Sequence, residues 1–539
     1  RPLIWKTRDR LSKPNNRIYY NTDYEYKFIA VVDSGATYAW MGVNEFGFSI
    51  LNSASYDLIE SRDFGNGGFM RHALGTVKSI DEFEELLIST NEEGRQTYAN
   101  FAVLDSTGSA NLFEVSANDY WQFDAATTNE GWIIRSNFSQ NGGGESGLER
   151  YNRSIEIVTN LCSNNQLNHN SLFEHQFRDF SDANSNAIEF PFYQQFDENT
   201  PFGFYNTEYS INSNQTVSGA IIRGILPNES TYLTTLFAIL GNPITAVTVP
   251  YFPVGEPPLV SYSDSIPALT FSANAIKKKL FWENEFIDSF LIENDESGLK
   301  TNIIEFEEEI LCETEMHLEE WRNNNFEVED ILSFQSDIAD SVLTFINTIS
   351  INDSLIANFD FEQTSQIDSY TIQFYDKSLH APTHWLWDFD EDGVIDSQIQ
   401  NPIYIFPDEG MYTVMLYIYN ENYSDFVIKE DFVIVANSNE TQNIIPNKLL
   451  PAYPNPFNPS TTITIINNCN TQYKKIGLDI FNIKGQKIKQ LNNNKLSEGK
   501  HSFVWKGKNN FGVSVSSGIY LVKLQIDDSV FTQKIVLLK

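Results

Sequence analysis

Short runs of β-branched and aromatic residues, separated by Asn, Gly and Ser, fill the first half of the chain. Such runs, alternating in polarity or apolar throughout and bounded by turn residues, are typical of β-strands. The opening stretch RPLIWKTRD also predicts a strand, because it is apolar from Leu3 to Trp5 before it becomes charged. We expect further strands within the segments 26–34, 38–53, 98–106, 109–116, 120–126 and 131–139.

Two segments among these strands have apolar residues at helical spacing, 79–90 and 145–163. Helices that cover a meander of strands give an α+β domain built in layers, which we assign to residues 1–270. The period then changes, and from Phe306 to Trp321 apolar and aromatic residues recur about every four positions among glutamates. This pattern predicts a helical extension over 271–350, a pair of amphipathic helices whose glutamates form a solvated face.

Two shorter segments predict small β-sandwiches. In residues 351–437 a strand and an acidic turn precede a strictly alternating run that includes Val414 and Leu416. Residues 438–448 are a polar linker, and residues 449–539 open with four prolines and continue as alternating strands. The fold class is therefore α+β, with two all-β domains at the end.

Composition narrows the range of partners. The chain has 539 residues and a formal net charge of −36, which repels nucleic acid phosphates and anionic lipid headgroups. We expect no nucleic acid partner, and no apolar run approaches the roughly 20 residues that span a bilayer. The three cysteines, Cys162, Cys312 and Cys469, are too few and too far apart for a disulfide framework, so we expect plain buried thiols.

Common hydrolase and nucleotide motifs are absent from the sequence. No G-x-S-x-G or G-x-x-x-x-G-K-[ST] motif occurs, and the seven histidines lack zinc-ligand spacing. Polar residues at the ends of apolar runs remain as candidates for chemistry. Such asparagines form turns in many proteins, and they also serve as donors to an oxyanion. The candidates are Lys6, Asp9, Asn52, Asn137 and Arg150.

Five stretches in order resemble the N-terminal-nucleophile cysteine hydrolases, the family of penicillin V acylase, choloylglycine hydrolase and the isopenicillin-N acyltransferases. The stretches are RPLIWKTRD, GVNEFGFSILNSAS, RSNFS, ERYNRS and LTTLFAILGNP. The resemblance covers about the first half of the chain and implies an αββα sandwich. It also implies a small-molecule amide substrate, attacked by a cysteine that is the first residue of the mature protein, with no cofactor.

The resemblance assigns roles to the candidate residues. A terminal amine, with a pKa of about 7.7 to 8.0, can serve as general base for its own thiol. Asp9 would hold that amine, and Lys6, where relatives have arginine, would favour the thiolate. Asn137 through its side-chain amide and Asn52 through its backbone N–H would bind the oxyanion, and Arg150 would lie near the amine and Asp9.

The nucleophilic cysteine of the family is not at the corresponding place in this sequence. In relatives it precedes the RPL stretch by one strand and a turn, whereas the first cysteine here is Cys162. We therefore expect that a leader, the cysteine and part of the first strand precede Arg1 in the full-length protein. The alternative is a catalytically inactive surface adhesion protein that has kept the fold.

The segment 351–437 resembles a polycystic-kidney-disease (PKD) domain through WDFDEDGVIDS, NPIYIF and GMYTVMLYIYN. That family supplies spacers and modules that adhere to carbohydrate, which implies a surface polysaccharide as partner. Its acidic turn has the D-x-D-x-D-G order of a calcium loop, but Ile399 occupies the twelfth position, where calcium loops have glutamate. Calcium and a metal-free acidic turn are both open, and the candidate ligands are Asp388, Asp390, Asp392 and Asp396.

The last segment resembles the C-terminal sorting domain of type IX secretion substrates. It has YPNPFNPSTTI, LDIFNIKGQKI, WKGKNNFG and SGIYLVKL in order, and it closes on QKIVLLK. This resemblance implies passage through the periplasm, the type IX machinery as partner, and a final location outside the cell or on its surface. The sequence as a whole predicts a secreted amidohydrolase or acyltransferase, and it does not decide between hydrolysis and acyl transfer.

Overall fold

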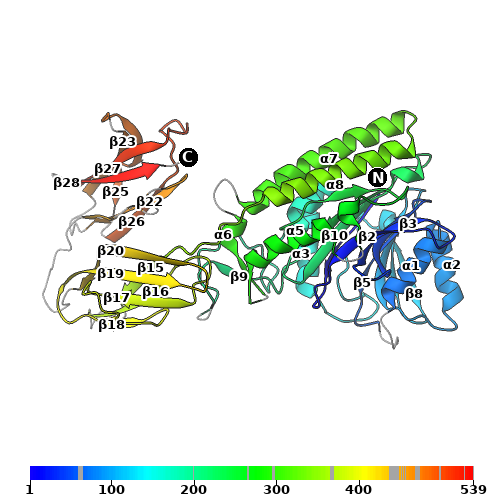
Figure 1. Ribbon diagram of the computed structural model, residues 1–539, viewed down its shortest axis with the longest axis horizontal. Coiled ribbons are helices and arrows are strands. Elements are labelled where there is room, and N and C mark those ends of the chain that lie inside the picture. The colour runs from blue at the N-terminus through cyan, green and yellow to red at the C-terminus, as the bar shows by residue number, and fades with distance from the viewer. Residues whose placement is uncertain are drawn as a thin grey trace.

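The computed structural model shows a large lobe built from residues 1–350 and, beside it, two β-sandwiches (Figure 1). The long helices α7 (Leu299–Asn323) and α8 (Val328–Thr348) lie side by side along one edge of the large lobe (Figure 1). The structure describes residues 1–539 except 59–64, 198–199, 264–265, 284, 294–297, 364–369, 436–447, 451, 453–454, 456, 468–473, 483, 497–498, 527–528 and 538–539.

Two antiparallel sheets form the centre of the large lobe. The larger sheet is a meander in which seven strands lie in sequence order. Its strands are β2 (Asn16–Asn21), β3 (Phe28–Asp33), β4 (Ala39–Asn44), β5 (Ser49–Ala54), β6 (Ala99–Leu104), β7 (Ala110–Val115) and β8 (Tyr120–Asp124). The smaller sheet has the order β1 (Leu3–Asp9), β10 (Thr216–Arg223), β11 (Thr235–Leu240) and β12 (Val249–Tyr251).

The sheets pack face to face between two layers of helices. Ile29 and Val31 of the larger sheet share one hydrophobic core with Ile4 and Ile222 of the smaller sheet. Helices α1 (Asn66–Thr76) and α2 (Ile80–Thr90) bury their apolar faces on the outer side of the larger sheet. Helix α3 (Leu148–Ser163) packs on the outer side of β10 and β11. The mixed α+β prediction is confirmed, and the predicted helices at 79–90 and 145–163 are present.

The predicted strand at 131–139 is wrong. Residues 132–136 have no regular secondary structure, and side-chain acceptors bind the backbone N–H groups that follow them. The expectation of buried thiols is also wrong for Cys162 and Cys312, which are exposed on α3 and α7, because they lie on the polar sides of these helices. Cys469 lies outside the described residues.

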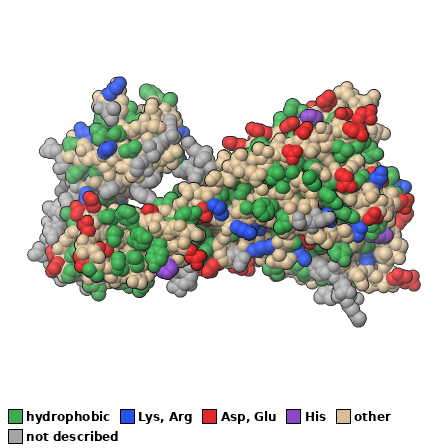
Figure 2. All heavy atoms as spheres, in the orientation of Figure 1, with side chains coloured by type: hydrophobic (Ala, Val, Ile, Leu, Met, Phe, Trp, Pro, Cys, Tyr) green, Lys and Arg blue, Asp and Glu red, His purple; other side chains and the backbone are tan. Residues whose placement is uncertain are grey.

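The predicted helical extension over 271–350 contains α7 (Leu299–Asn323) and α8 (Val328–Thr348), and a third helix, α5 (Ala268–Leu280), begins just before its predicted start. Ile310 and Trp321 of α7 belong to the same core as the two sheets, so the helices pack as part of the large lobe. Acidic side chains gather over this part of the surface (Figure 2), among them the exposed Glu308, Glu309, Glu313, Glu319 and Glu320.

Glu307 departs from the predicted solvated acidic face. It is buried, and its carboxylate forms a bidentate ion pair with the buried Arg178, with N–O distances of 2.6 and 3.0 Å. Arg178 also donates to the carbonyl oxygens of Phe173 and Pro243. The position faces the lobe because it continues the apolar stripe of α7, and the buried charge is compensated there.

Short elements complete the large lobe. A three-stranded sheet has the order β13 (Phe281–Trp282), β14 (Phe286–Asp288) and β9 (Phe204–Asn206). The short helices are α4 (His169–Ser171), α6 (Ser289–Ile292), η1 (Ala125–Thr127), η2 (Leu172–Gln176), η3 (Thr231–Leu233) and η4 (Leu259–Ser261).

Residues 355–435 form a sandwich of two three-stranded sheets, whose core contains the fully buried Trp387 and Phe389. The ring of Tyr412 packs against that of Phe406, with the centroids 4.2 Å apart and the ring planes tilted by 37°. One sheet has β15 (Phe359–Gln363), β16 (Thr371–Asp376) and β18 (Ile403–Ile405), and the other β17 (His384–Asp388), β19 (Gly410–Tyr419) and β20 (Ser424–Val435). His380 contacts the large lobe, where its Nδ1 lies 2.7 Å from Oδ2 of Asp288.

The last segment is a second all-β unit around the buried Trp505. One sheet has β21 (Lys448–Leu449), β22 (Thr461–Asn467) and β26 (Gly499–Trp505). The other sheet has β24 (Lys487–Asn492), β23 (Lys474–Asn482), β27 (Gly518–Ile526) and β28 (Ser529–Leu537), with β25 (Lys495–Leu496) paired to β23. The predicted linker at 438–448 lies outside the described residues except for Lys448. Among the helices that the structure describes, none has the length and apolar character to cross a membrane.

Candidate functional site

Strand β1 carries Lys6 and Asp9 to the edge of the smaller sheet. Lys6 is half-buried and donates from Nζ to Oδ1 of Asn52, 2.9 Å away in β5 of the facing sheet. Arg8, on the same side of β1, forms a bidentate pair with Asp33 of β3. Burial, and then repulsion by Arg8, lowers the pKa of Lys6 well below its ordinary value, while Asp9 and Asp33 oppose the shift. Lys6 therefore retains its proton, and with it its positive charge, less firmly than an arginine would at that position.

Asp9 lies where the pairing of β1 with β10 shifts register. It is opposite Thr216, whose hydroxyl donates to Oδ1 of Asp9 at 2.7 Å. Burial raises the pKa of Asp9, and the positive charge of Arg150, the Thr216 hydrogen bond and the charges of Lys277 and Lys6 oppose the rise. Asp9 is half-buried, and its carboxylate lies among the positive charges of Arg150, Lys277 and Lys6.

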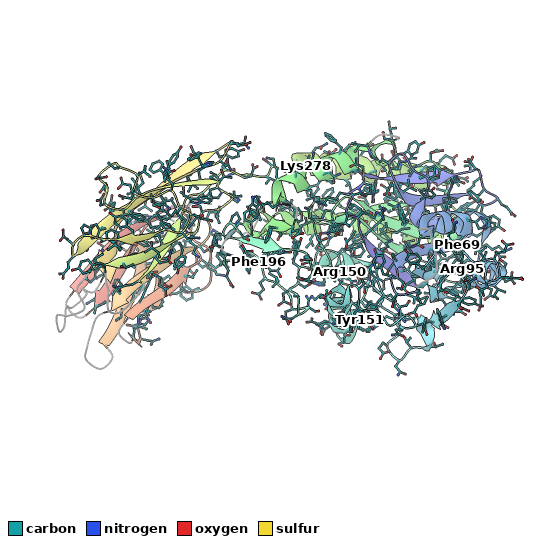
Figure 3. All side chains as sticks on the ribbon, turned by 90° about the horizontal axis from the view of Figure 1, so that it is seen from below. Phe69, Arg95, Arg150, Tyr151, Phe196 and Lys278 are labelled. Carbon is teal, nitrogen blue, oxygen red and sulfur yellow. The ribbon has the colours of Figure 1, made fainter. Side chains whose placement is uncertain are left out.

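Asn137 belongs to the irregular segment after β8. Its Nδ2 donates to the carbonyl oxygen of Ala54, at the end of β5, over 3.1 Å. Its Oδ1 accepts from Nη2 of Arg150, also at 3.1 Å. One of the two amide hydrogens of Asn137 is thus used by the protein, and the second is available in principle to a ligand. Arg150, at the N-terminal end of α3, is labelled in Figure 3 with its neighbour Tyr151.

The structure brings the five predicted residues into one network. Two hydrogen bonds join Lys6 to Asn52 and Arg150 to Asn137, and Asp9 interacts electrostatically with both cations. The residues come from three parts of the chain that are far apart in the sequence: β1, β5, and the stretch that runs from Asn137 into α3. Their assignment to catalytic steps stays a prediction.

Two carboxylates that sequence reasoning missed hold the segment around Asn137. Asp57 accepts hydrogen bonds from the backbone N–H groups of Ser139 and Gly144 and from the hydroxyl of Ser55. A Cβ at Gly144 would lie 2.7 Å from the Cβ of Asp57, so the glycine allows the close approach. Burial alone would raise the pKa of Asp57, but these hydrogen bonds lower it below the ordinary value.

Glu114 is the second of these carboxylates and is fully buried in β7. It accepts from Nε of Arg135, from the backbone N–H of Gln140, and from both the backbone N–H and Nδ2 of Asn141. Asn137 lies between Arg135 and Gln140, so Glu114 fixes the segment on both sides of it. The sequence signal was a lone glutamate in the apolar run SANLFEVS, at a position where a strand faces the interior.

Lys277 is a further cation near Asp9 that the sequence reasoning missed. It occupies the apolar stripe of α5 with Ala273, Ile276 and Leu280, all of which are buried. The sequence signal that could have identified Lys277 is a lysine within the apolar stripe of a predicted helix, since a buried lysine is rare unless it is paired.

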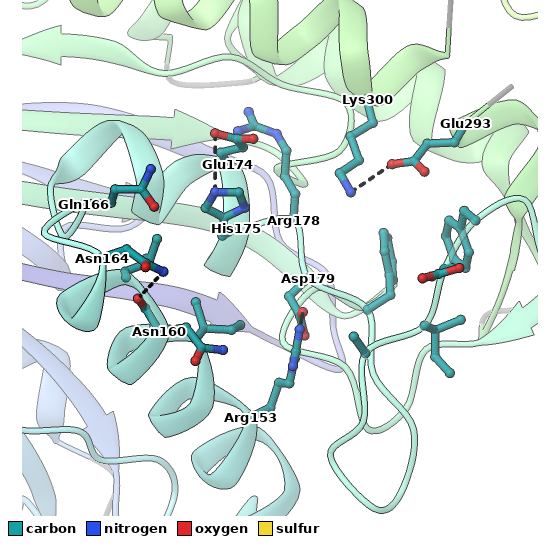
Figure 4. A pocket seen from close by; sticks show the side chains of 17 residues that line it. Arg153, Asn160, Asn164, Gln166, Glu174, His175, Arg178, Asp179, Glu293 and Lys300 are labelled. Carbon is teal, nitrogen blue, oxygen red and sulfur yellow. Dashed lines mark hydrogen bonds and ion pairs between the residues drawn. The ribbon is translucent and has the colours of Figure 1, made fainter. Parts of the chain in front are cut away.

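A cavity of about 640 Å³ is lined in part by α3, at residues that follow Arg150 along the helix, from Arg153 to Asn164 (Figure 4). Arg153 and Asp179 form an ion pair in its wall, with Nη2 2.7 Å from Oδ1, and Lys300 pairs with Glu293 across it. None of the five predicted site residues is among the residues that line it. Arg150 and Arg153, one helical turn apart, therefore face different surroundings.

The acidic turn after β17 brings three of the four predicted ligands together. One carboxylate oxygen from each of Asp388, Asp390 and Asp392 lies within 4.8 Å of the others, while Asp396 accepts a hydrogen bond from the backbone N–H of Phe389. Asp388 is buried, and its two oxygens accept from three backbone N–H groups of the turn. These bonds stabilise the turn without an ion, so the geometry fits both alternatives.

Comparisons with known proteins give one family match and several distant structural similarities. Residues 455–529 match the family model of the FlgD Ig-like domain, which agrees with the all-β structure of that segment. A comparison with curated proteins gives no match.

Among solved structures, penicillin V acylase from Agrobacterium tumefaciens is 11% identical, with 46% of this chain and 82% of that chain covered and a TM-score of 0.27. A variant of conjugated bile acid hydrolase from Clostridium perfringens is 11% identical, with 49% and 90% covered and a TM-score of 0.25. PorZ, a type-IX secretion component of Porphyromonas gingivalis, is 14% identical, with 34% and 21% covered and a TM-score of 0.13. This chain thus spans about a fifth of PorZ, and all three similarities are too distant to carry an argument about activity.

Proposed function

We propose that the large lobe is the body of an N-terminal-nucleophile amide hydrolase or acyltransferase, whose cysteine precedes Arg1 in the full-length protein. The observation that carries the proposal is the environment of Asp9. Its carboxylate lies among the cations Lys6, Arg150 and Lys277. Two of these cations are hydrogen-bonded to the candidate asparagines, Lys6 to Asn52 and Arg150 to Asn137. The layering of helices and sheets, helix–sheet–sheet–helix, supports the αββα sandwich that the family has.

The proposed chemistry assigns each group a separate task. The terminal amine takes the proton of its own thiol, and Asp9 orients that amine by accepting from it. The thiolate attacks the amide carbon, and the amide of Asn137 with the N–H of Asn52 stabilises the oxyanion, each such donor contributing about 3 kcal/mol in comparable sites. On collapse the terminal ammonium returns its proton to the leaving nitrogen, which departs as an amine and leaves an acyl-enzyme. The freed terminal amine then takes a proton from water in a hydrolase, or from a second amine in a transferase, as that molecule attacks the acyl group and releases the thiol.

The coding sequence upstream of Arg1 provides the first test. A leader followed by a cysteine at the start of the mature protein supports the proposal, and any other residue at that place contradicts it. The full-length protein is then assayed on a panel of small N-acyl amides. Asp9→Asn is expected to lower kcat/KM by about 100-fold or more, while the exposed Asp81→Asn leaves it unchanged. Unchanged kinetics for Asp9→Asn would remove Asp9 from the mechanism.

The second candidate function is a catalytically inactive adhesion protein. The positions of the two described cysteines favour it if no upstream cysteine exists. Cys162 is exposed near the C-terminal end of α3, about 18 Å along the helix from Arg150, and Cys312 is exposed on α7. Neither thiol is placed to replace a nucleophile beside Asp9, so without an upstream cysteine the lobe would bind an amide and not cleave it.

We also propose that the protein is secreted through the type IX machinery to the cell surface or the medium. The support is the order of sorting-domain motifs, together with the Ig-like match of residues 455–529. In the PKD-like sandwich we propose a calcium ion at the acidic turn, supported by the three carboxylates within 4.8 Å of one another. A surface polysaccharide stays a proposed partner of the same sandwich, on the resemblance alone.

A further inference from the structure

Lys277 is a buried lysine whose ammonium group is held by backbone carbonyls. Its side chain comes from α5 and is 8% exposed. Nζ donates to the carbonyl oxygen of Asn214 at 2.6 Å and to that of Thr216 at 2.9 Å. Removing an ammonium group from water in this way costs free energy unless other groups compensate its charge. A lysine at this position therefore indicates a structural or functional role.

Thr216 connects Lys277 to the candidate site. Its carbonyl oxygen accepts from Lys277, and its hydroxyl donates to Oδ1 of Asp9. Asn242 holds the backbone just before Thr216, because its Nδ2 donates to the carbonyl oxygen of Ser213 at 2.7 Å. The Thr216 hydroxyl is therefore aimed at Asp9 by contacts made on the backbone around it, and Lys277 provides two of them.

The charges around Lys277 are unbalanced toward the positive. Asp9 is the carboxylate that attracts it, Lys13 repels it, and the ring of Phe281 lies 5.8 Å from Nζ. Burial, and then repulsion by Lys13, lowers the pKa of Lys277 to about 7, while Asp9 opposes the shift. Asp9 in turn is stabilised as a carboxylate by Arg150, Lys277 and Lys6.

We propose that Lys277 is a positioning residue of the candidate site: it fixes Thr216, which orients Asp9, and its charge favours the ionised form of Asp9. The functional meaning of this arrangement rests on the role proposed for Asp9. It also makes the site responsive to pH. As pH rises through neutrality Lys277 loses its proton, and the support that it gives to the carboxylate is withdrawn.

A double-mutant cycle on the chain as it stands tests the physical coupling without any catalytic assay. The variants are Lys277→Met, Asp9→Asn and their combination, and the thermal unfolding midpoint is measured at pH 6 and pH 9. Lys278→Met is the matched control, because Lys278 is the next residue of α5, exposed and labelled in Figure 3. At pH 6 the shift of the double variant should differ from the sum of the single shifts by more than about 2 °C, and by less at pH 9.

Additive shifts at pH 6 would overturn the proposal. If Lys277→Met does not fold, Thr216→Val replaces it in the cycle, since it removes the connecting hydroxyl and keeps the buried volume. Non-additivity with Asp9→Asn then supports the connection and additivity overturns it. Lys278→Met is expected to be additive with Asp9→Asn at both pH values.

The pH profile of an active full-length protein separates positioning from a merely structural effect. The acidic limb of kcat/KM should move to higher pH in Lys277→Met, because Asp9 is then harder to ionise, and Lys277→Arg should restore it. A uniform loss at every pH without a shift overturns the proposal. Coupling in the unfolding cycle without amide cleavage would refute the proposed function alone, whereas cleavage without coupling would refute the role of Lys277 alone.

Discussion

Replacing Glu114 should release the segment that carries Asn137. In the native protein the fully buried carboxylate accepts four hydrogen bonds, one from Arg135, one from Gln140 and two from Asn141. Glu114→Ala removes all four acceptor contacts together. It also leaves the guanidinium of Arg135, whose side chain is 5% exposed, without its counter-ion.

The expected cost follows from those contacts. Breaking a buried ion pair by removing one partner destabilises a protein by about 3–5 kcal/mol, because the remaining charge stays buried. The unpaired N–H groups of Gln140 and Asn141 would add to this, but the loop can relax toward solvent and recover part of their hydrogen bonding. We therefore expect Glu114→Ala to lower the free energy of unfolding by about 3–5 kcal/mol. Glu114→Gln, which keeps the shape and one acceptor oxygen, should cost less, about 1.5–3 kcal/mol.

Hydrogen exchange followed by mass spectrometry reports on this segment directly. Amides in the peptide that spans 135–144 should exchange at least about 100-fold faster in Glu114→Ala, since each 1.4 kcal/mol corresponds to a factor of ten. Urea unfolding of the same variants gives the global change. The exposed Glu130→Ala, a few residues before the segment, is the matched control and should leave both measurements unchanged.

The pH dependence has a definite sign. Burial alone would raise the pKa of Glu114, but the hydrogen bonds from Gln140, Arg135 and Asn141 lower it below its ordinary value. A carboxyl group with a lowered pKa stabilises the fold above its unfolded pKa, and this stability is lost as pH falls through the folded pKa. The difference between wild type and Glu114→Gln should thus be constant near neutrality and shrink below about pH 4. A cost under about 1 kcal/mol with unchanged exchange would refute the reasoning.

Two other sites give independent predictions. Glu307→Ala should lower the free energy of unfolding by about 3–5 kcal/mol, because it leaves the buried Arg178 without its counter-ion. The exposed neighbour Glu308→Ala should leave the free energy of unfolding almost unchanged, and equal effects of the two variants in chemical unfolding would contradict the buried ion pair. Titration calorimetry of the protein with calcium should show binding that Asp390→Asn weakens and the exposed Asp408→Asn does not, and an absence of heat in the wild type would refute the metal.

Much of the local structure could be predicted from the sequence, because it follows from periodicity. Strand β1 and the meander strands β3 to β8 coincide with predicted segments, whereas β2 (Asn16–Asn21) was not predicted. Helix α2 begins after Ser79, whose hydroxyl accepts from the backbone N–H of Glu82 as an N-cap. The segment 131–139 has the same apolar look as a strand, yet its backbone pairs with Asp57 and Glu114. Composition cannot distinguish a strand from an irregular segment that is held by side-chain carboxylates, since both arrangements satisfy the backbone hydrogen bonds.

The candidate site divides in the same way. Asp9, Asn137 and Arg150 could be singled out from motifs in order along the chain, because each motif is local. Lys277 and Glu114 could not, since their roles depend on contacts between elements far apart in sequence. The sequence by itself determined most of the segments that form strands and helices, because periodicity is a local property. Only the tertiary structure decided which buried charges meet, because a charge can leave water only where another part of the chain supplies its partners.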